Sequence, residues 1–206
     1  MAVSHISRCS SNAGLEWAYY QNPFTIISDP AYSNFDPSFL KNTTPIYNSS
    51  TTYIGLEVSS DSNDISIYGS TETFSPYYFV INHRGYIYAE TGGTYTLTTD
   101  NDDDIMLAWL GSAAYSGWDR ANANMTYDIS VNTGPMSVSA ELVKGQYYPI
   151  RLVYAQAPGR VIFNATLTSP SGEIILGQNT AASPSVVQYS CDGITAPLYP
   201  PFGQET

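Results

Sequence analysis

The sequence predicts an all-β fold: a β-sandwich of two antiparallel sheets with long loops and little helix. The 206 residues include 15 glycines and 13 prolines, which divide the chain into the short segments typical of sandwiches. Many of these segments alternate apolar and polar residues with the period of a half-buried strand. Charged residues make up 12% of the chain, about half of the roughly 25% of typical soluble domains, whereas helical bundles and coiled coils are rich in them. Hydrophobic residues reach 43%, enough to fill a core, so disorder is not expected.

The expected elements follow one another at short intervals. Residues 1–60 are rich in serine, asparagine, proline and tyrosine, and we expect long ordered loops with short strands there. From about Asp64 the alternation sharpens, and turns are expected at Arg84-Gly85, at residues 91–93 (TGG) and at residues 169–172 (SPSG). Ten short strands at this spacing favour a two-sheet sandwich. The expected strands are 65–68, 77–81, 85–90, 95–99, 105–110, 127–131, 137–142, 148–154, 160–168 and 174–176.

We expect residues 1–206 to form one domain, because all-β sandwiches often exceed 200 residues and no linker or repeat divides the chain. The ordered core is expected from about residue 9 to residue 191, and the proline-rich tail after residue 196 is expected to be loose. No apolar run approaches the length of a transmembrane helix, so this domain is not expected to insert into a membrane. The first residues lack the apolar centre of a signal peptide, which we interpret as a mature domain without its targeting segment.

The charge balance excludes two classes of partner. The formal net charge is −11, with only 7 lysines and arginines. Such a chain does not bind nucleic acid by neutralising phosphates, and an anionic membrane surface would repel it. We expect a monomer that binds uncharged partners.

Cysteines and glycosylation sequons indicate the compartment. Cys9 and Cys191 lie near opposite ends of the chain; a disulfide between them would bring the termini together, and two buried thiols are the alternative. Four Asn-x-Ser/Thr sequons begin at Asn42, Asn48, Asn124 and Asn164. Each sequon is weak evidence alone, but together with a disulfide they favour a secreted or cell-surface protein.

The densest charge in the chain is the run of residues 100–104 (DNDDD), directly before the apolar strand expected at 105–110. A solvated acidic loop is one interpretation. The other is a cation site, because closely spaced carboxylates repel one another unless they are compensated, and oxygen ligands suit calcium. An EF-hand starting at Asp100 is excluded, because Ile105 stands at the glycine position and Gly111 at the final glutamate position. A calcium site must therefore take further ligands from another loop.

Enzyme chemistry is not indicated. The glutamates are scattered, so no pair of catalytic carboxylates for glycoside hydrolysis can be identified. The two histidines, His5 and His83, have no nucleophile motif nearby, and phosphate-binding loops and zinc patterns are absent. We expect a binding protein rather than an enzyme.

A series of short blocks resembles one protein family. Residues 14–20 (GLEWAYY) resemble the motif of the GLEYA family of fungal adhesins, which are relatives of the flocculin lectins and of the protective-antigen-type β-sandwich. The remaining blocks occur in the expected order at 83–89 (HRGYIYA), 93–97 (GTYTL), 109–111 (WLG), 114–123 (AYSGWDRANA), 145–154 (GQYYPIRLVY) and 169–172 (SPSG). The resemblance implies a calcium-dependent lectin domain at the tip of a cell-wall adhesin, which binds the terminal sugars of glycans.

The resemblance also implies a set of calcium ligands. Two adjacent aspartates joined by a cis peptide bond hold calcium in that family, and they match Asp103 and Asp104 here. A second loop, after the strand expected at 148–154, contributes an asparagine side chain and two backbone carbonyls. Gln156 stands at the asparagine position, where its amide oxygen has a longer reach; a surface turn residue is its other interpretation. The carbonyls match those of Pro158 and Arg160.

Calcium takes six to eight oxygen ligands, which leaves positions for two vicinal sugar hydroxyls. An aromatic side chain beside the ion would then cover the apolar face of the sugar, and the candidates are Tyr115 and Trp118. Packing of Trp118 in the core is the alternative. The Arg160 side chain would bind a sugar hydroxyl or face solvent, and Glu16 and Trp17 are interpreted as structural.

The leading prediction is therefore a secreted, calcium-dependent glycan-binding adhesin domain. Two alternatives stay open. One is a structural or homotypic cell-wall adhesion module whose metal site is degenerate, as the glutamine at position 156 suggests. The other is a sugar-targeting module of a larger secreted hydrolase or toxin.

Overall fold

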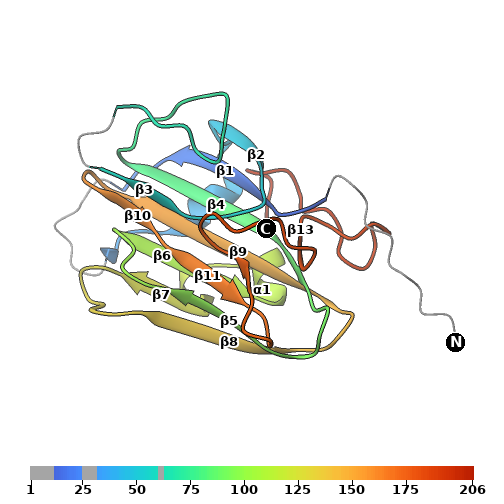
Figure 1. Cartoon of the computed structure of the whole chain (residues 1–206). Helices are drawn as coiled ribbons and strands as arrows, with labels where there is room; N and C mark the ends of the chain where they lie inside the picture. The colour runs from blue at the N-terminus through green and yellow to red at the C-terminus, as the bar shows by residue number, and fades with distance from the viewer. Residues whose placement is uncertain (1–11, 25–31, 60–62) are drawn as a thin grey trace, which may run out of the picture.

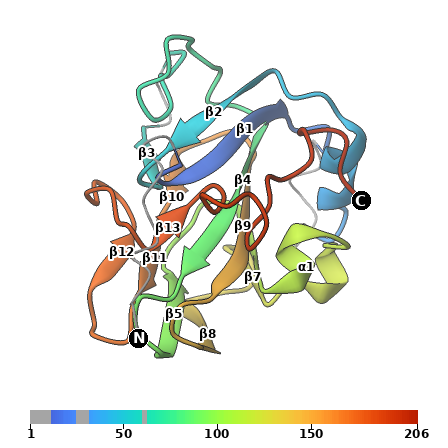
Figure 2. The ribbon, with the colours of Figure 1, turned by 90° about the vertical axis from the view of Figure 1, so that its right-hand side faces the viewer.

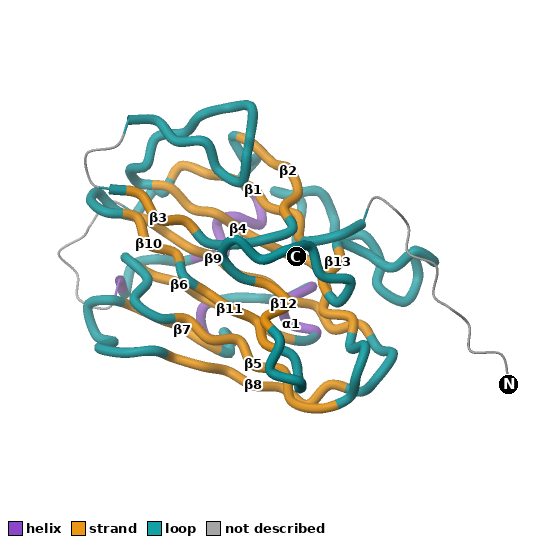
Figure 3. The backbone as a smooth tube through the Cα atoms, in the orientation of Figure 1, coloured by secondary structure: helices purple, strands orange, loops and turns teal. Residues whose placement is uncertain are grey.

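The computed structural model describes residues 12–24, 32–59 and 63–206. Over these residues the chain forms two antiparallel sheets packed face to face and a short two-stranded sheet (Figures 1 and 2). Little of the chain is helical (Figure 3). The predicted all-β sandwich is confirmed.

The larger sheet has the strand order β2-β1-β4-β9-β6-β7, and β13 pairs with β4. Its centre is the long pair of β4 and β9, whose register runs from Phe79 opposite Gln156 to Tyr88 opposite Tyr147. Its strands are β1 (Leu15–Gln21), β2 (Tyr47–Thr51), β4 (Phe79–Tyr88), β6 (Ile105–Leu110), β7 (Met125–Asp128), β9 (Tyr147–Gln156) and β13 (Val186–Val187).

The smaller sheet has the order β12-β11-β5-β8, and the two-stranded sheet pairs β10 with β3. These strands are β3 (Leu56–Val58), β5 (Gly93–Thr99), β8 (Met136–Leu142), β10 (Val161–Phe163), β11 (Ala165–Thr168) and β12 (Ile174–Leu176). The helical turns are η2 (Pro37–Asn42), α1 (Ser112–Tyr115) and η3 (Arg120–Asn122). Within the described part of the chain, no helix has the length and apolar character needed to cross a membrane.

The larger sheet is buried on both faces. One face packs against the smaller sheet and contributes Trp17, Met106 and Leu152 to the main core. The other face, which carries Trp109, packs under α1 and the loops around η2; Figure 2 shows α1 on the side opposite the smaller sheet. This double burial explains why β6 is apolar along its whole length, whereas β5 alternates outward threonines with buried Tyr95 and Leu97.

One expected turn lies inside a strand. The strands expected at 77–81 and 85–90 are parts of the continuous strand β4, so the prediction of a turn at Arg84-Gly85 is wrong. Gly85 serves close packing instead: a Cβ atom there would lie 2.7 Å from Leu15 Cδ2 and 2.8 Å from the Val187 carbonyl oxygen. Glycine is thus required by the approach of β1 and β13 rather than by a turn.

Two other expected strands also differ. Residues 160–168 divide at Asn164, because β10 pairs with β3 while β11 pairs with β5 in the smaller sheet. Residues 65–68 form no strand and make only an isolated bridge from Ile65 to Phe74. The turn expected at residues 169–172 does connect β11 to β12, with Gly172 at φ 86°.

The C-terminal tail is packed, so the prediction of a loose tail after residue 196 is wrong. Tyr199 and Glu205 are each 6% exposed, and the Tyr199 hydroxyl donates to the Gly85 carbonyl at 3.0 Å. Glu205 forms ion pairs with two buried arginines, Arg84 and Arg151. Because buried charges must be paired, these arginines require the tail. The expected start of the core at residue 9 lies outside the described residues.

Gly14 gives a testable prediction about the residues that open β1. Its φ is 84°, and a Cβ atom there would lie 2.0 Å from the Thr51 carbonyl oxygen. We expect Gly14→Ala to lower the free energy of unfolding by about 1–3 kcal/mol more than Gly117→Ala does. Gly117 is the matched control, because its φ is 77° and nothing lies within 4 Å of the added atom. Equal losses for the two variants in urea denaturation would show that the contact with Thr51 is unimportant.

Candidate functional site

The acidic loop joins β5 to β6 at one end of the sandwich. The Asp103–Asp104 peptide bond is cis, as the family resemblance implied. Asp102 is buried and anchors the loop, because its carboxylate accepts from the Asn164 backbone N–H at 2.5 Å and from the Thr99 hydroxyl. The Asp103 N–H donates to the Ile162 carbonyl at 2.8 Å. The loop is therefore held against the end of β5 and the β10–β11 segment, with Asp103 and Asp104 directly before β6.

Asp104 is oriented by two donors from distant parts of the chain. Its Oδ1 accepts from the Tyr32 hydroxyl, and its Oδ2 accepts from the backbone N–H of Ala157. The Asp103 and Asp104 side chains also interact with each other. Both carboxylates thus lie at the junction of the acidic loop with the loop after β9.

The charge of this aspartate pair is only partly compensated: the Arg160 charge lowers the pKa of Asp103, and the hydrogen bonds from Tyr32 and Ala157 lower the pKa of Asp104, but burial outweighs both effects. Burial, followed by the neighbouring Asp104 carboxylate, raises the pKa of Asp103 to about 6. Burial likewise raises the pKa of Asp104, and the charge of Asp128 adds to this effect. None of the four ion pairs among the described residues includes either aspartate. Two adjacent carboxylates in such surroundings favour a bound cation.

Gln156 lies in the same cluster. It is the last residue of β9 and is 1% exposed, so its interpretation as a surface turn residue is wrong. Its Oε1 accepts from the Tyr154 hydroxyl, and its Nε2 donates to the Arg160 carbonyl at 3.0 Å. The Tyr154 hydroxyl also contacts the Asp103 carbonyl. Tyr154 thus connects the acidic loop to the loop after β9.

These residues fit a calcium ion by the chemistry of their donors. All the candidate ligand atoms are oxygens, which a hard cation prefers. They belong to the two carboxylates, the Gln156 amide and the Arg160 carbonyl. Pro158 lies in the same loop and is exposed. No cluster of three or more histidine, cysteine, aspartate or glutamate side chains suited to a metal occurs within the described ranges. A calcium site here therefore depends on amide and carbonyl oxygens.

Sequence reasoning did not identify three contributors to this site. Tyr32 orients Asp104, and Tyr154 orients Gln156. Asp128 is the last residue of β7, and one of its carboxylate oxygens is buried without a hydrogen-bond partner. Tyr154 could have been found, because it precedes Gln156 by two positions in a strand and shares its face. Tyr32 and Asp128 had no sequence signal, because tertiary contacts bring them to the acidic loop: Asp128 pairs with Ile105 across β7 and β6, and Tyr32 reaches Asp104 from a distant loop.

The two aromatic candidates do not lie beside the aspartates. Trp118 is fully buried, 5.5 Å from Trp109 between ring centroids and 4.3 Å from the Arg151 guanidinium. Trp109 lies near the far end of β6, about 17 Å from Asp104 at about 3.3 Å per residue. The alternative interpretation, core packing of Trp118, therefore describes the structure. Tyr115 lines a separate pocket of about 640 Å³ at that end.

The Arg160 side chain faces outward. Its guanidinium forms an ion pair with Glu57 at 2.6 Å, and both side chains are more than half exposed. Its carbonyl and its side chain thus point to different environments, one toward Gln156 and the other toward solvent. Contact of the guanidinium with a sugar stays a prediction.

The modification candidates lie on the surface. The four sequon asparagines are exposed, which glycosylation requires; they are Asn42, Asn48, Asn124 and Asn164. Cys191 is also exposed and lies 3.9 Å from Asn12 Nδ2. Cys9 is outside the described residues, so its disulfide with Cys191 stays a prediction.

The fold is shared with several solved β-sandwich domains. The structure aligns with the A domain of epithelial adhesin 6 from Candida glabrata at a TM-score of 0.64 and 16% identity, over 88% of this chain and 94% of that one. The A domain of epithelial adhesin 9 gives a TM-score of 0.62 and 19% identity, over 85% and 88% of the two chains. The PA14 domain of the antifreeze protein MpAFP gives 0.53 and 19%, over 88% and 93%.

Residues 79–169 match the GLEYA domain family model. The resemblance predicted from the sequence blocks is thereby confirmed.

Two proteins of Schizosaccharomyces pombe named for cell agglutination are similar in sequence. One, pfl4, is 26% identical over 95% of this chain and 34% of its own length. The other is 35% identical over 34% of this chain and 6% of its own length. The chain thus spans about a third or less of these relatives.

Proposed function

We propose that this chain is a calcium-dependent carbohydrate-binding domain of a secreted cell-wall adhesin, folded as one monomeric domain and without catalytic activity. Its ligands would be the terminal sugars of glycans. The observation that carries the proposal is the oxygen cluster of Asp103, Asp104, Gln156 and Arg160 at one end of the sandwich.

The relatives support this proposal. The adhesin A domains that share the fold were solved with Galβ1-3GlcNAc bound, and the fission yeast relatives are named for cell agglutination. Because the chain is much shorter than those relatives, we propose that adhesion is an activity of a larger cell-surface protein in which this domain binds the sugar.

Each residue of the cluster would have a separate role in binding the ion. Asp103 and Asp104 would hold the ion with the Gln156 amide oxygen and the Pro158 and Arg160 carbonyls, and bound calcium orients vicinal hydroxyls of a sugar. The Tyr32 hydroxyl and the Ala157 N–H orient the Asp104 carboxylate. Tyr154 does the same for Gln156. Such supporting contacts commonly change metal affinity by about 10–100-fold when removed.

One observation favours a second candidate function, an adhesion module whose metal site is degenerate. Both polar ends of the Gln156 amide are engaged, by the Tyr154 hydroxyl and by the Arg160 carbonyl. A glutamine held in this way would bind calcium weakly. Adhesion would then rely on surface contacts rather than on a bound sugar.

A glycan array probed twice tests these two candidates. We expect the domain to bind a defined group of glycans in 2 mM calcium. This binding should be lost in excess EGTA and should return when calcium is restored. The calcium-restored sample is the control for irreversible unfolding. Binding that is equally strong in EGTA would contradict the calcium-dependent site, and an array without any specific glycan would favour the degenerate module.

A further inference from the structure

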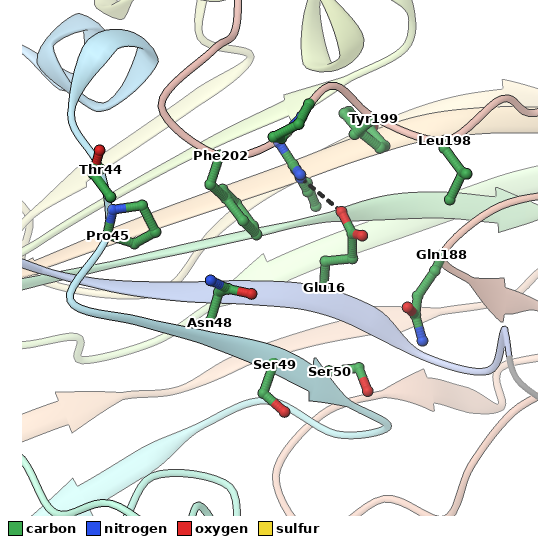
Figure 4. A pocket seen from close by; sticks show the side chains of 12 residues that line it. Glu16, Thr44, Pro45, Asn48, Ser49, Ser50, Gln188, Leu198, Tyr199 and Phe202 are labelled. Atoms are coloured by element: carbon green, nitrogen blue, oxygen red, sulfur yellow. Dashed lines mark hydrogen bonds and ion pairs between the residues drawn. The ribbon is translucent and has the colours of Figure 1, made fainter.

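A second pocket lies between the C-terminal tail and the edge of the larger sheet (Figure 4). Its volume is about 590 Å³, within the range of small-molecule sites. The pocket and the aspartate cluster lie at different points along β4. Arg84 of β4 lines the pocket, whereas Phe79, at the start of β4, pairs with Gln156 of the cluster. At about 3.3 Å per residue the two places are about 17 Å apart. The pocket is therefore separate from the proposed calcium site.

Strand register builds the floor of this pocket. Ser50 on β2 lies opposite Glu16 on β1, which lies opposite Arg84 on β4, which lies opposite Arg151 on β9. Cross-strand partners share a face of the sheet, so these four polar side chains form one row. The tail covers the two arginines and leaves Glu16 25% exposed at the open end.

The floor of the pocket is close to neutral. Arg84 Nε donates to Glu16 at 2.8 Å, and Glu205 pairs with both Arg84 and Arg151. Two carboxylates thus balance two guanidinium groups. A charged ligand would gain no net attraction here, whereas a neutral ligand with hydroxyl groups could accept from and donate to the row.

The walls combine an aromatic ring with uncharged polar side chains. The Phe202 ring stacks on Arg84, with the guanidinium carbon 3.5 Å from the ring centroid. Asn48, Ser50 and Gln188 line the pocket around Glu16 and Phe202 (Figure 4). A pyranose ring presents hydroxyls at its edge and an apolar C–H face, which match amides and hydroxyls on one side and an aromatic ring on the other.

From this match we propose that the pocket is a second carbohydrate-binding site, which takes a neutral hexopyranose without calcium. The sugar has two possible sources with the same chemistry. It is either part of a separate glycan or the first sugar of an N-glycan on Asn48, because the sequon Asn48-Ser49-Ser50 itself lines the pocket.

The first experiment uses the whole chain, ¹⁵N-labelled and without glycans, in excess EGTA so that a calcium-dependent site is silent. Methyl α-mannopyranoside, methyl β-galactopyranoside and N-acetylglucosamine are each titrated to 100 mM. We expect at least one of them to shift the backbone amide signals of Ser50, Gln188 and Phe202. Asn48→Tyr, which fills the pocket mouth, should weaken this binding at least tenfold.

Asn42→Tyr is the matched control, because Asn42 is also an exposed sequon asparagine but does not line the pocket; it should leave the binding unchanged. Glu16→Gln keeps the side-chain shape and should also weaken binding. Thermal unfolding of each variant shows that the fold is retained. If Asn42→Tyr and Asn48→Tyr weaken binding equally, the sugar does not occupy the pocket and the proposal is wrong.

The second experiment uses protein secreted from yeast and identifies the source of the sugar. Mass spectrometry follows the rate at which endoglycosidase H releases the glycans at Asn48 and at Asn42 under native conditions. At least tenfold slower release at Asn48 supports the attached glycan as the occupant. A separate glycan is supported as the occupant if a free sugar binds and either the two glycans are released at equal rates or Asn48 carries no glycan. Equal release without binding of any free sugar overturns the proposal, whatever the array shows for the calcium-dependent site.

Discussion

Replacing Asp104 with asparagine is expected to weaken calcium binding by at least about 100-fold and to abolish calcium-dependent glycan binding. The substitution removes one of two adjacent, partly buried carboxylates, whose mutual repulsion a bound cation would relieve. Without metal, the loss of this buried charge does not remove any ion pair of the described residues. The metal-free variant should therefore stay folded, which circular dichroism can check.

Asp100→Asn is the matched control for this prediction. Asp100 belongs to the same acidic run but is exposed, so its substitution removes the same charge without touching the aspartate pair. Isothermal titration with calcium should show wild-type affinity to within about threefold for Asp100→Asn, since exposed charges interact weakly through water. Wild-type calcium affinity in Asp104→Asn would rule out the proposed ligand set.

The second large effect concerns stability. Glu205→Gln is expected to lower the free energy of unfolding by about 3–5 kcal/mol, the usual cost of breaking a buried ion pair by removing one partner. Glu205 contacts both Arg84 and Arg151, whose side chains are 2% and 0% exposed. Glutamine would leave two buried guanidinium groups with only the Glu16 carboxylate. Urea denaturation at pH 7 gives the free energy.

Glu57→Gln is the control for Glu205→Gln, because it breaks the ion pair with Arg160 in which both side chains are more than half exposed. An exposed pair contributes below about 1 kcal/mol. Similar losses for the two variants would mean that the tail carboxylate is not needed to pair the buried arginines. A large loss for Glu205→Gln alone would establish the tail as part of the folded core.

The strands that sequence predicted best are those with a regular pattern of burial. The strand expected at 137–142 corresponds to β8, and the strand at 105–110 corresponds to β6. Strand β4 was expected as two strands, because glycine at position 85 is also a turn residue in sequence. Its role in close packing depends on Leu15 and Val187, which are far away along the chain. No local pattern can distinguish these two uses of glycine.

The candidate site likewise contains residues that could be predicted from the sequence and residues that could not. The aspartate pair and Gln156 could be named from motif position, and they do lie in one cluster. The orienting partner of Asp104 could not, because Tyr32 reaches it across 72 positions of sequence. The aromatic candidates failed for a related reason: Trp118 follows the strand that starts at the site, but that strand carries the chain away to the opposite end of the sandwich.

The sequence by itself determined the all-β class and the acidic oxygen donors of the candidate site. Both follow from local patterns, namely the alternation of short segments and the run of aspartates before an apolar strand. Only the tertiary structure decided that the tail carboxylate pairs with Arg84 and Arg151, and that a pocket forms beside Glu16. These features depend on the order and register of the strands and on the packing of the tail, which bring together residues far apart in sequence; Arg84 and Glu205, for example, are 121 positions apart.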